Sequence, residues 1–318
     1  MAIKRANLLI DAAAREKYAR GVNLLKGEFT GPTTVSLGIA GPAQRVSTYD
    51  LFIVWHHTAM STLTPATQGD RNAAHRGPVF CPWHRFMLRQ LELNLQRVLG
   101  DANFGLPYWD WATDGQRTPA QQKLSKVWST NAMGGSGSPV TTGPFGFHAN
   151  DPGTFRVRIE ADVNGRLVQT NHGLRRTLGT QISRLPNKLD VTGAVGLTPY
   201  DASPWSTSSA GFRNRLEGWA PPSPPALHNR VHVWVGGDML PSTSPNDPIF
   251  FMHHCNVDRL WEAWLTQHGR IYLPAQTAPV SLNGHRINDL MASLVSAPMK
   301  PADVLDMTGV YAYDSLAV

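Results

Sequence analysis

The chain has 318 residues, of which 42% are apolar and 16% charged, and its formal net charge is +6 at pH 7. This composition suits a sizeable core and excludes an intrinsically disordered chain. Two cysteines cannot build a disulfide scaffold. No apolar run reaches the ~20 residues of a membrane span, so no membrane partner is expected. The basic residues are scattered, so we expect no nucleic-acid partner either.

Three helices are predicted in the first third of the chain. Good helix formers from Asp11 to Lys26 indicate the first, and Gly, Pro and Thr clusters over 28–46 indicate a loop after it. Ser47 suits the N-cap of a second, largely buried helix that runs to about Met60. The third extends from Trp83 to Leu99, with Gly100 at its end.

The remaining segments are less regular. Residues 133–144 read as a loop, and residues 155–169 as a hairpin that turns at Asn164-Gly165. The proline-rich run 220–225 predicts a stiff connector that delays the next helix until about His228.

A last long helix is predicted from about Phe250 to Gln267, followed by loops with short elements. No charge run or break in composition divides the chain. We therefore expect a single, mainly α domain over residues 1–318, with long loops and a few short strands.

Six of the twelve histidines stand apart by their positions. His228 and His232 are four residues apart on a predicted helix, so their rings point the same way and can bind one metal ion. His254, on the next helix, can complete a set of three. A second set comes earlier in the chain and consists of His56, His75 and His84.

The ligand type narrows the choice of metal. Sites made only of imidazoles suit Cu, Zn, Fe or Ni, whereas carboxylate-rich sites suit Mg, Ca or Mn. No acidic residue stands at matching spacing among these histidines, which argues against di-iron carboxylate chemistry. Two facing sets of three histidines favour a pair of copper ions.

Several segments together resemble the tyrosinases, from about residue 49 to the C-terminus. The first copper signature of that family is similar to Asn72-Ala73-Ala74-His75-Arg76 followed by Pro82-Trp83-His84-Arg85. The second is similar to His228-Asn229-Arg230-Val231-His232, Pro245-Asn246-Asp247-Pro248 and Phe251-Met252-His253-His254. The segments Leu106-Pro107-Tyr108-Trp109-Asp110-Trp111 and Phe212-Arg213-Asn214-Arg215-Leu216-Glu217-Gly218 also match bacterial members.

The resemblance implies a type-3 copper protein whose antiparallel four-helix bundle holds a coupled dicopper centre. One copper would be bound by His56, His75 and His84. The other would be bound by His228, His232 and His254. Such a centre uses O₂ to hydroxylate monophenols at the ortho position and to oxidise o-diphenols to o-quinones, the chemistry of melanin formation.

The resemblance also implies roles around the metals. Glu217 and Asn229 match the family pair that holds a water for deprotonating the phenol, whose pKa of ~10 requires a base near neutral pH. Phe250, Val233 and Asp238 fall at positions expected to line the substrate pocket.

Two departures from the family matter. Ala73 stands where some members carry a cysteine that is cross-linked to a histidine, so we expect no thioether. The chain ends soon after Tyr311-Ala312-Tyr313, which predicts no C-terminal shielding domain and an open site unless a caddie or copper-chaperone protein covers it. The first residues lack the apolar region of a secretory signal, which predicts a cytoplasmic protein unless such a partner exports it.

Several other functions remain open. A catechol oxidase limited to diphenols, or an o-aminophenol oxidase, would use the same copper site. A hemocyanin-like protein would carry O₂ without turnover, and a di-zinc hydrolase would use the same ligands for another reaction.

Overall fold

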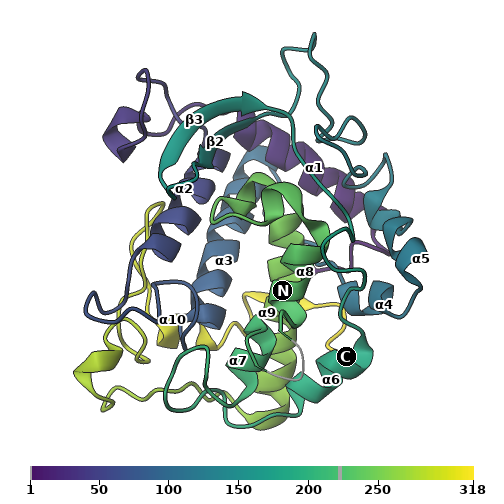
Figure 1. Cartoon of the computed structure of the whole chain (residues 1–318). Coiled ribbons are helices and arrows are strands. Elements are labelled where there is room, and N and C mark those ends of the chain that lie inside the picture. The colour runs from purple at the N-terminus through teal and green to yellow at the C-terminus, as the bar shows by residue number, and fades with distance from the viewer. Residues whose placement is uncertain (1, 221–223) are drawn as a thin grey trace.

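The computed structural model describes residues 2–220 and 224–318, and it is mainly helical, as predicted (Figure 1). The helices are α1 (Ala12–Gly27), α2 (Thr48–Ser61), α3 (Phe80–Leu99), α4 (Trp111–Gly115), α5 (Pro119–Lys123), α6 (Lys188–Val195), α7 (Phe212–Glu217), α8 (Leu227–Val235), α9 (Ile249–His268) and α10 (Pro301–Leu305). The strands are β1 (Ile3–Arg5), β2 (Val157–Ala161), β3 (Leu167–His172) and β4 (Tyr311–Tyr313). Part of the predicted proline-rich connector, 221–223, lies outside the described residues.

The long helices begin and end where their capping residues predict. The side chain of Asp11 accepts a hydrogen bond from the backbone N–H of Ala14, and that of Ser47 accepts one from Asp50. Gly100 ends α3 with φ +63°, a conformation that glycine adopts without strain. Helix α3 begins three residues before the predicted Trp83 because Pro82 lies in its first turn, where no backbone donor is needed.

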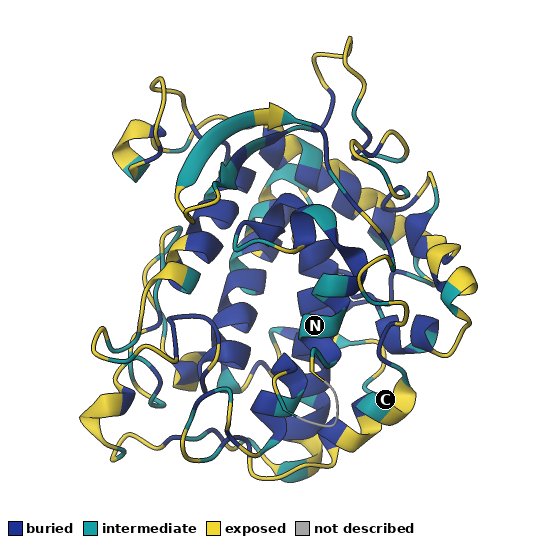
Figure 2. Cartoon of the chain, in the orientation of Figure 1, coloured by how far each residue is buried: buried dark blue, intermediate teal, exposed yellow. Residues whose placement is uncertain are grey.

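Four helices carry predicted metal ligands and lie in the interior, namely α2, α3, α8 and α9. Helix α3 packs against α9, and α8 also packs against α9. Helix α2 joins them through an edge-to-face contact between Trp55 and Trp83, with ring centroids 5.4 Å apart. Figure 2 shows these helices in the buried centre and the exposed residues on the periphery. One continuous apolar cluster runs from Leu8 to Tyr311.

The first and last strands form a two-stranded parallel sheet that the periodicity of the sequence did not indicate. Arg5 at the end of β1 is fully buried and donates two hydrogen bonds to the carboxylate of Glu92 in α3, at 3.0 and 3.1 Å. A third goes to Asp258 in α9, at 3.0 Å. This contact, which we call the Arg5 clamp, ties the strand to both central helices.

The other short elements agree in part with the prediction. Strands β2 and β3 form the expected antiparallel hairpin, with Gly165 at φ +73° in its turn. Residues 133–144 contain no helix or strand, as predicted. Helices α4 to α7 are five to eight residues long and were not predicted. Within the described residues, no helix is both long and apolar enough to cross a membrane.

Candidate metal centre

The first group of histidines comes from α2, α3 and the segment before α3. His56 lies on α2, His75 precedes α3, and His84 lies in its second turn. The ring centroids of His56 and His75 are 5.2 Å apart, and those of His75 and His84 are 4.7 Å apart. One ring nitrogen of each lies within 4.8 Å of the others, a spacing that fits three ligands on one ion.

The second group converges more tightly. His228 and His232 lie one turn apart on α8, and His254 approaches from α9. Their Nε2 atoms are 3.1 Å apart for His228 and His232, 3.3 Å for His228 and His254, and 3.4 Å for His232 and His254. The two groups adjoin each other, because the ring of His84 stacks on that of His254.

Backbone carbonyls fix which nitrogen of four rings carries the proton. The Nδ1 atom of His56 lies 2.7 Å from the carbonyl of Ser242, and that of His232 lies 2.7 Å from the carbonyl of Met239. His84 and His228 make similar contacts with the carbonyls of Phe80 and Glu217, at 2.8 and 3.2 Å. A carbonyl only accepts, so each Nδ1 must donate, and each Nε2 is left with a bare lone pair.

These lone pairs need a positive partner. The Nε2 atoms of His228 and His232 face each other across 3.1 Å although neither carries a proton. The Nε2 atoms of His56 and His84 are buried with no hydrogen-bond partner among the described residues. Burial lowers the pKa of His56 to about 3 and that of His232 to about 4, so both rings stay neutral near pH 7. Neutral imidazoles with converging free nitrogens fit two metal ions, one in each group.

Two further histidines adjoin the groups in sequence, at 57 and 253. The Nδ1 atom of His57 lies 2.7 Å from the hydroxyl of Ser242, and its ring is not part of the first group. His253 is fully buried, one of its ring nitrogens lies within 4.8 Å of those of the second group, and its ring stacks on that of His228 with centroids 5.0 Å apart. Neither nitrogen of His253 has a hydrogen-bond partner among the described residues.

Glu217 and Asn229 lie beside His228. The backbone N–H of Arg76 donates to one carboxylate oxygen of Glu217 at 2.6 Å, and the guanidinium of Arg213 donates to the other at 3.0 Å. Burial raises the pKa of Glu217, and the charge of Arg213 opposes that rise. The side-chain oxygen of Asn229 lies 3.0 Å from the Nδ1 atom of His228. Both predicted residues therefore adjoin the second group of histidines.

A cavity of about 280 Å³ opens over both groups. Its wall includes Asn229 and the predicted Val233. The complete lining is His56, Met60, His75, Arg76, Trp219, Pro225, His228, Asn229, His232, Val233, Leu240, Pro241 and Ser244. Apart from the neutral histidines, Arg76 is the one ionisable residue among these described residues. Arg76, Trp219 and Met60 were not among the predicted pocket residues, although the position of Arg76 directly after His75 was an available signal.

Two predicted pocket residues lie elsewhere. Phe250 is not among the described residues that line the cavity. It is buried against the imidazoles, with its ring centroid 4.1 Å from that of His254 and 4.9 Å from that of His56. Asp238 is also buried, and its carboxylate binds the guanidinium of Arg175 at 2.7 Å. Asp238 is not among the described residues that line this cavity, and its carboxylate pairs with Arg175 instead.

Comparison with known proteins decides the family. A model of the common central domain of tyrosinase matches residues 46–267. The chain is 40% identical to a tyrosinase of Streptomyces glaucescens over 86% of this chain and 90% of that protein. It is 38% identical to a tyrosinase of Streptomyces antibioticus over 85% of this chain and 90% of that protein. The chain belongs to the tyrosinase family.

The fold agrees with this assignment. A polyphenol oxidase from Thermothelomyces thermophila superposes with a TM-score of 0.68 over 98% of this chain and 88% of that one, at 22% identity. The tyrosinase family consists of dicopper enzymes, and the two groups of histidines match its need for two metal sites. The chain is therefore a type-3 copper phenol oxidase with two copper ions as cofactor. The agreement of family and fold favours this function over that of an oxygen carrier or a zinc hydrolase.

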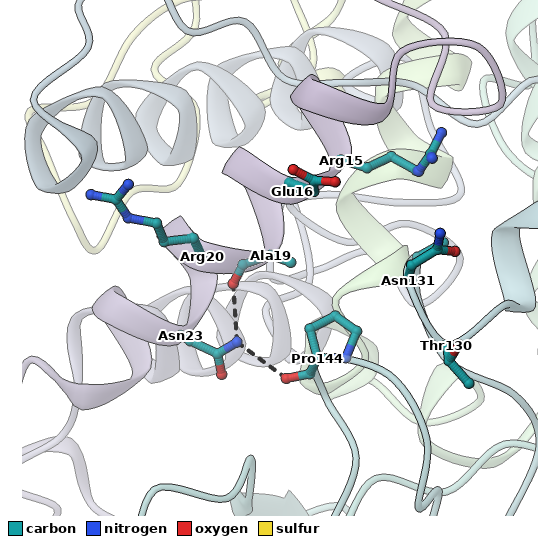
Figure 3. Close-up of a pocket in the computed structure, with 9 residues that line it drawn as sticks. Arg15, Glu16, Ala19, Arg20, Asn23, Thr130, Asn131 and Pro144 are labelled. Atoms are coloured by element: carbon teal, nitrogen blue, oxygen red, sulfur yellow. Dashed lines mark hydrogen bonds between the residues drawn. The ribbon is translucent and has the colours of Figure 1, made fainter.

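Chemistry rather than size marks the tyrosinase site. A larger cavity of about 420 Å³ opens beside α1, where Asn23 donates to the carbonyls of Ala19 and Pro144 (Figure 3). Arg15, Glu16, Arg20 and the loop residues around Asn131 line it, with no histidine among them. It lacks the grouped imidazoles that a metal pair requires, so the smaller cavity is the better candidate for the functional site.

Proposed function

We propose that this tyrosinase-family chain hydroxylates monophenols at the ortho position and oxidises the resulting o-diphenols to o-quinones. One copper is held by His56, His75 and His84, and the other by His228, His232 and His254. The observation that carries the proposal is the convergence of unprotonated Nε2 atoms, fixed by carbonyl contacts at Nδ1.

The copper pair, when bound, supplies the binding and reduction of O₂. The protein supplies a cavity of about 280 Å³ that admits an aromatic ring over the metal ligands. Its walls at Met60, Val233 and Leu240 are apolar and exclude water from the ring. The imidazoles remain neutral, so they stay available as ligands.

Glu217 and Asn229 provide for removal of the phenol proton. The Glu217 carboxylate accepts hydrogen bonds from the backbone N–H of Arg76, the guanidinium of Arg213 and the side chain of Trp219, and its remaining lone pair keeps acceptor capacity. The oxygen of Asn229 faces His228, which leaves its amide nitrogen to donate. Together they can hold a water that takes the proton and passes it to Glu217. This step separates monophenol hydroxylation from simple diphenol oxidation.

The proposal covers one catalytic domain over residues 1–318, supported by the continuous core cluster that extends from Leu8 to Tyr311. A copper-delivery partner and a cytoplasmic location remain predictions.

The direct test measures copper per chain and oxygen uptake with tyrosine, DOPA and an o-aminophenol. Two coppers per chain and uptake with both tyrosine and DOPA support the proposal. Uptake with DOPA alone would instead indicate a catechol oxidase, and binding of O₂ without product would indicate a carrier. A zinc-loaded sample is the control, and activity retained with zinc would contradict a copper reaction.

A further inference from the structure

The cavity over the histidines carries one cation at its mouth. Arg76 is exposed and lines this cavity, and no carboxylate among the described residues lies within ion-pairing distance of its guanidinium. The other arginines near the cavity differ: Arg213, for example, is fully buried between the carboxylates of Asp201 and Glu217. No acidic side chain lines the cavity among the described residues. The charge of Arg76 is therefore available to a ligand.

The backbone holds Arg76 in a fixed relation to the metal centre. Arg76 directly follows the ligand His75, and its N–H donates to Glu217 at 2.6 Å. Its φ is +63°, a left-handed conformation that costs a non-glycine residue roughly 1–2 kcal/mol. A glycine would adopt this turn without strain, so the arginine is retained at a cost in stability. Strained non-glycine residues cluster at functional sites.

The side chain is oriented by an aromatic ring on the other side of the mouth. The guanidinium of Arg76 lies over the indole of Trp219, 5.7 Å from the ring centroid. Trp219 is itself partly exposed and lines the same cavity. A guanidinium placed over an aromatic ring can still offer the N–H donors at its edge, and these match a carboxylate in paired geometry.

We propose that Arg76 selects phenols that carry a carboxylate on a short side chain para to the hydroxyl. The hydroxyl end of such a substrate lies at the histidines, the ring lies between Met60 and Val233, and the carboxylate reaches the edge of the Arg76 guanidinium. This inference rests on the proposed phenol oxidase activity and adds the substrate class to it.

The test compares 3-(4-hydroxyphenyl)propionate with its primary amide, which has nearly the same shape and no charge. We expect the copper-loaded protein to prefer the acid in kcat/KM. In Arg76→Gln the acid-to-amide ratio should fall about three- to tenfold, the range expected for a partly exposed charge-assisted contact. Arg76→Lys should keep part of the preference, because it keeps the charge but loses the paired geometry. Arg184→Gln is the matched control, since it removes an exposed arginine that does not line the cavity.

A second readout does not depend on turnover. The non-hydroxylated analogues 3-phenylpropionate and 3-phenylpropionamide should inhibit competitively, and the wild-type protein should bind the acid more tightly. Added salt should weaken this preference, because it screens an exposed charge pair. This measurement uses the wild-type chain and stays valid if Arg76→Gln folds poorly.

The outcomes separate the two proposals. If neither phenol is oxidised, the proposed function fails. If both are oxidised and the acid-to-amide ratio is the same in wild type, Arg76→Gln and Arg184→Gln, the function stands and the role of Arg76 is overturned. An inhibition preference that is insensitive to salt would also overturn it.

Discussion

The imidazoles of His84 and His254 lie face to face, with centroids 4.2 Å apart and ring planes inclined by 15°. His84 belongs to the first group and His254 to the second, so under the proposed ligand assignment this stacked pair lies between the two metal sites. The pair also joins α3 to α9, the two longest helices of the chain. The separation of the metals therefore depends on how these helices pack.

Replacing one ring of this pair should remove one metal. We expect His254→Ala to lose the copper of the second group and to lower phenol oxidation by more than about a hundredfold, since even loss of a ligand's supporting contact costs ~10–100-fold. Copper per chain by elemental analysis and oxygen uptake provide the measurements. His268→Ala is the control on the same helix, because His268 contacts the carbonyl of Val195 instead. Two coppers retained in His254→Ala would contradict the assignment.

Glu217→Gln should separate the two activities of the site. Loss of a proton acceptor typically costs ~10²–10⁴-fold in the step that needs it. We therefore expect oxidation of tyrosine to fall at least tenfold more than oxidation of DOPA. Asp201→Asn is a matched control, since Asp201 is a buried carboxylate that binds the same arginine, Arg213, at 2.8 Å. An unchanged tyrosine-to-DOPA ratio in Glu217→Gln would rule out the proposed role.

Acid should destabilise the metal-free chain over a defined pH range. Burial lowers the pKa of His56 to about 3 and that of His232 to about 4, below the ordinary value of 6.5. The unfolded chain therefore binds more protons below pH 6.5, and stability falls as the pH drops from 6.5 toward 4. Each such histidine contributes a loss of about 1.4 kcal/mol per pH unit in that range. Urea unfolding of the metal-free chain at pH 7.5, 6.5 and 5.5 measures this loss of stability. Equal urea midpoints at the three pH values would contradict the burial of neutral imidazoles.

The folded conformation of the segment between α8 and α9 should depend on one buried ion pair. Arg176 donates to both oxygens of Asp247, at 2.6 and 2.7 Å, and both side chains are fully buried. Removing one partner of such a pair costs ~3–5 kcal/mol, so Asp247→Asn should lower the free energy of unfolding by about this amount. The same segment supplies the Ser242 and Met239 carbonyls that fix two ligands, so copper retention should weaken as well.

Asp101→Asn provides the comparison for this pair. Asp101 binds Lys17 on the surface at 2.7 Å, where both side chains are partly exposed. An exposed pair contributes at most ~1 kcal/mol, so this variant should unfold near the wild-type midpoint. Equal losses in the free energy of unfolding in Asp247→Asn and Asp101→Asn would show that burial does not determine how much an ion pair contributes to stability.

The long helices and the pairing of His228 with His232 were predictable because their signals are local. Ser47 and Gly100 mark helix ends through contacts within a few residues, and the spacing of His228 and His232 follows from one helical turn. The position of Asp238 was not predictable, because its partner Arg175 lies 63 residues away in the sequence. The carbonyl partners of the histidines have no sequence signal at all, since every residue carries a carbonyl.

The Arg5 clamp has a practical consequence for how the protein is produced. Glu92 lies two turns after His84 on α3, and Asp258 lies one turn after His254 on α9, so the clamp ties the two helices together within two turns of the stacked rings. A purification tag or protease that displaces the first strand would remove Arg5 from both carboxylates, leaving Glu92 with Arg89 alone and Asp258 with Arg85 alone as charged partners among the described residues. Poor metallation of such a sample would then reflect damage at the N-terminal strand rather than any defect in the ligands themselves.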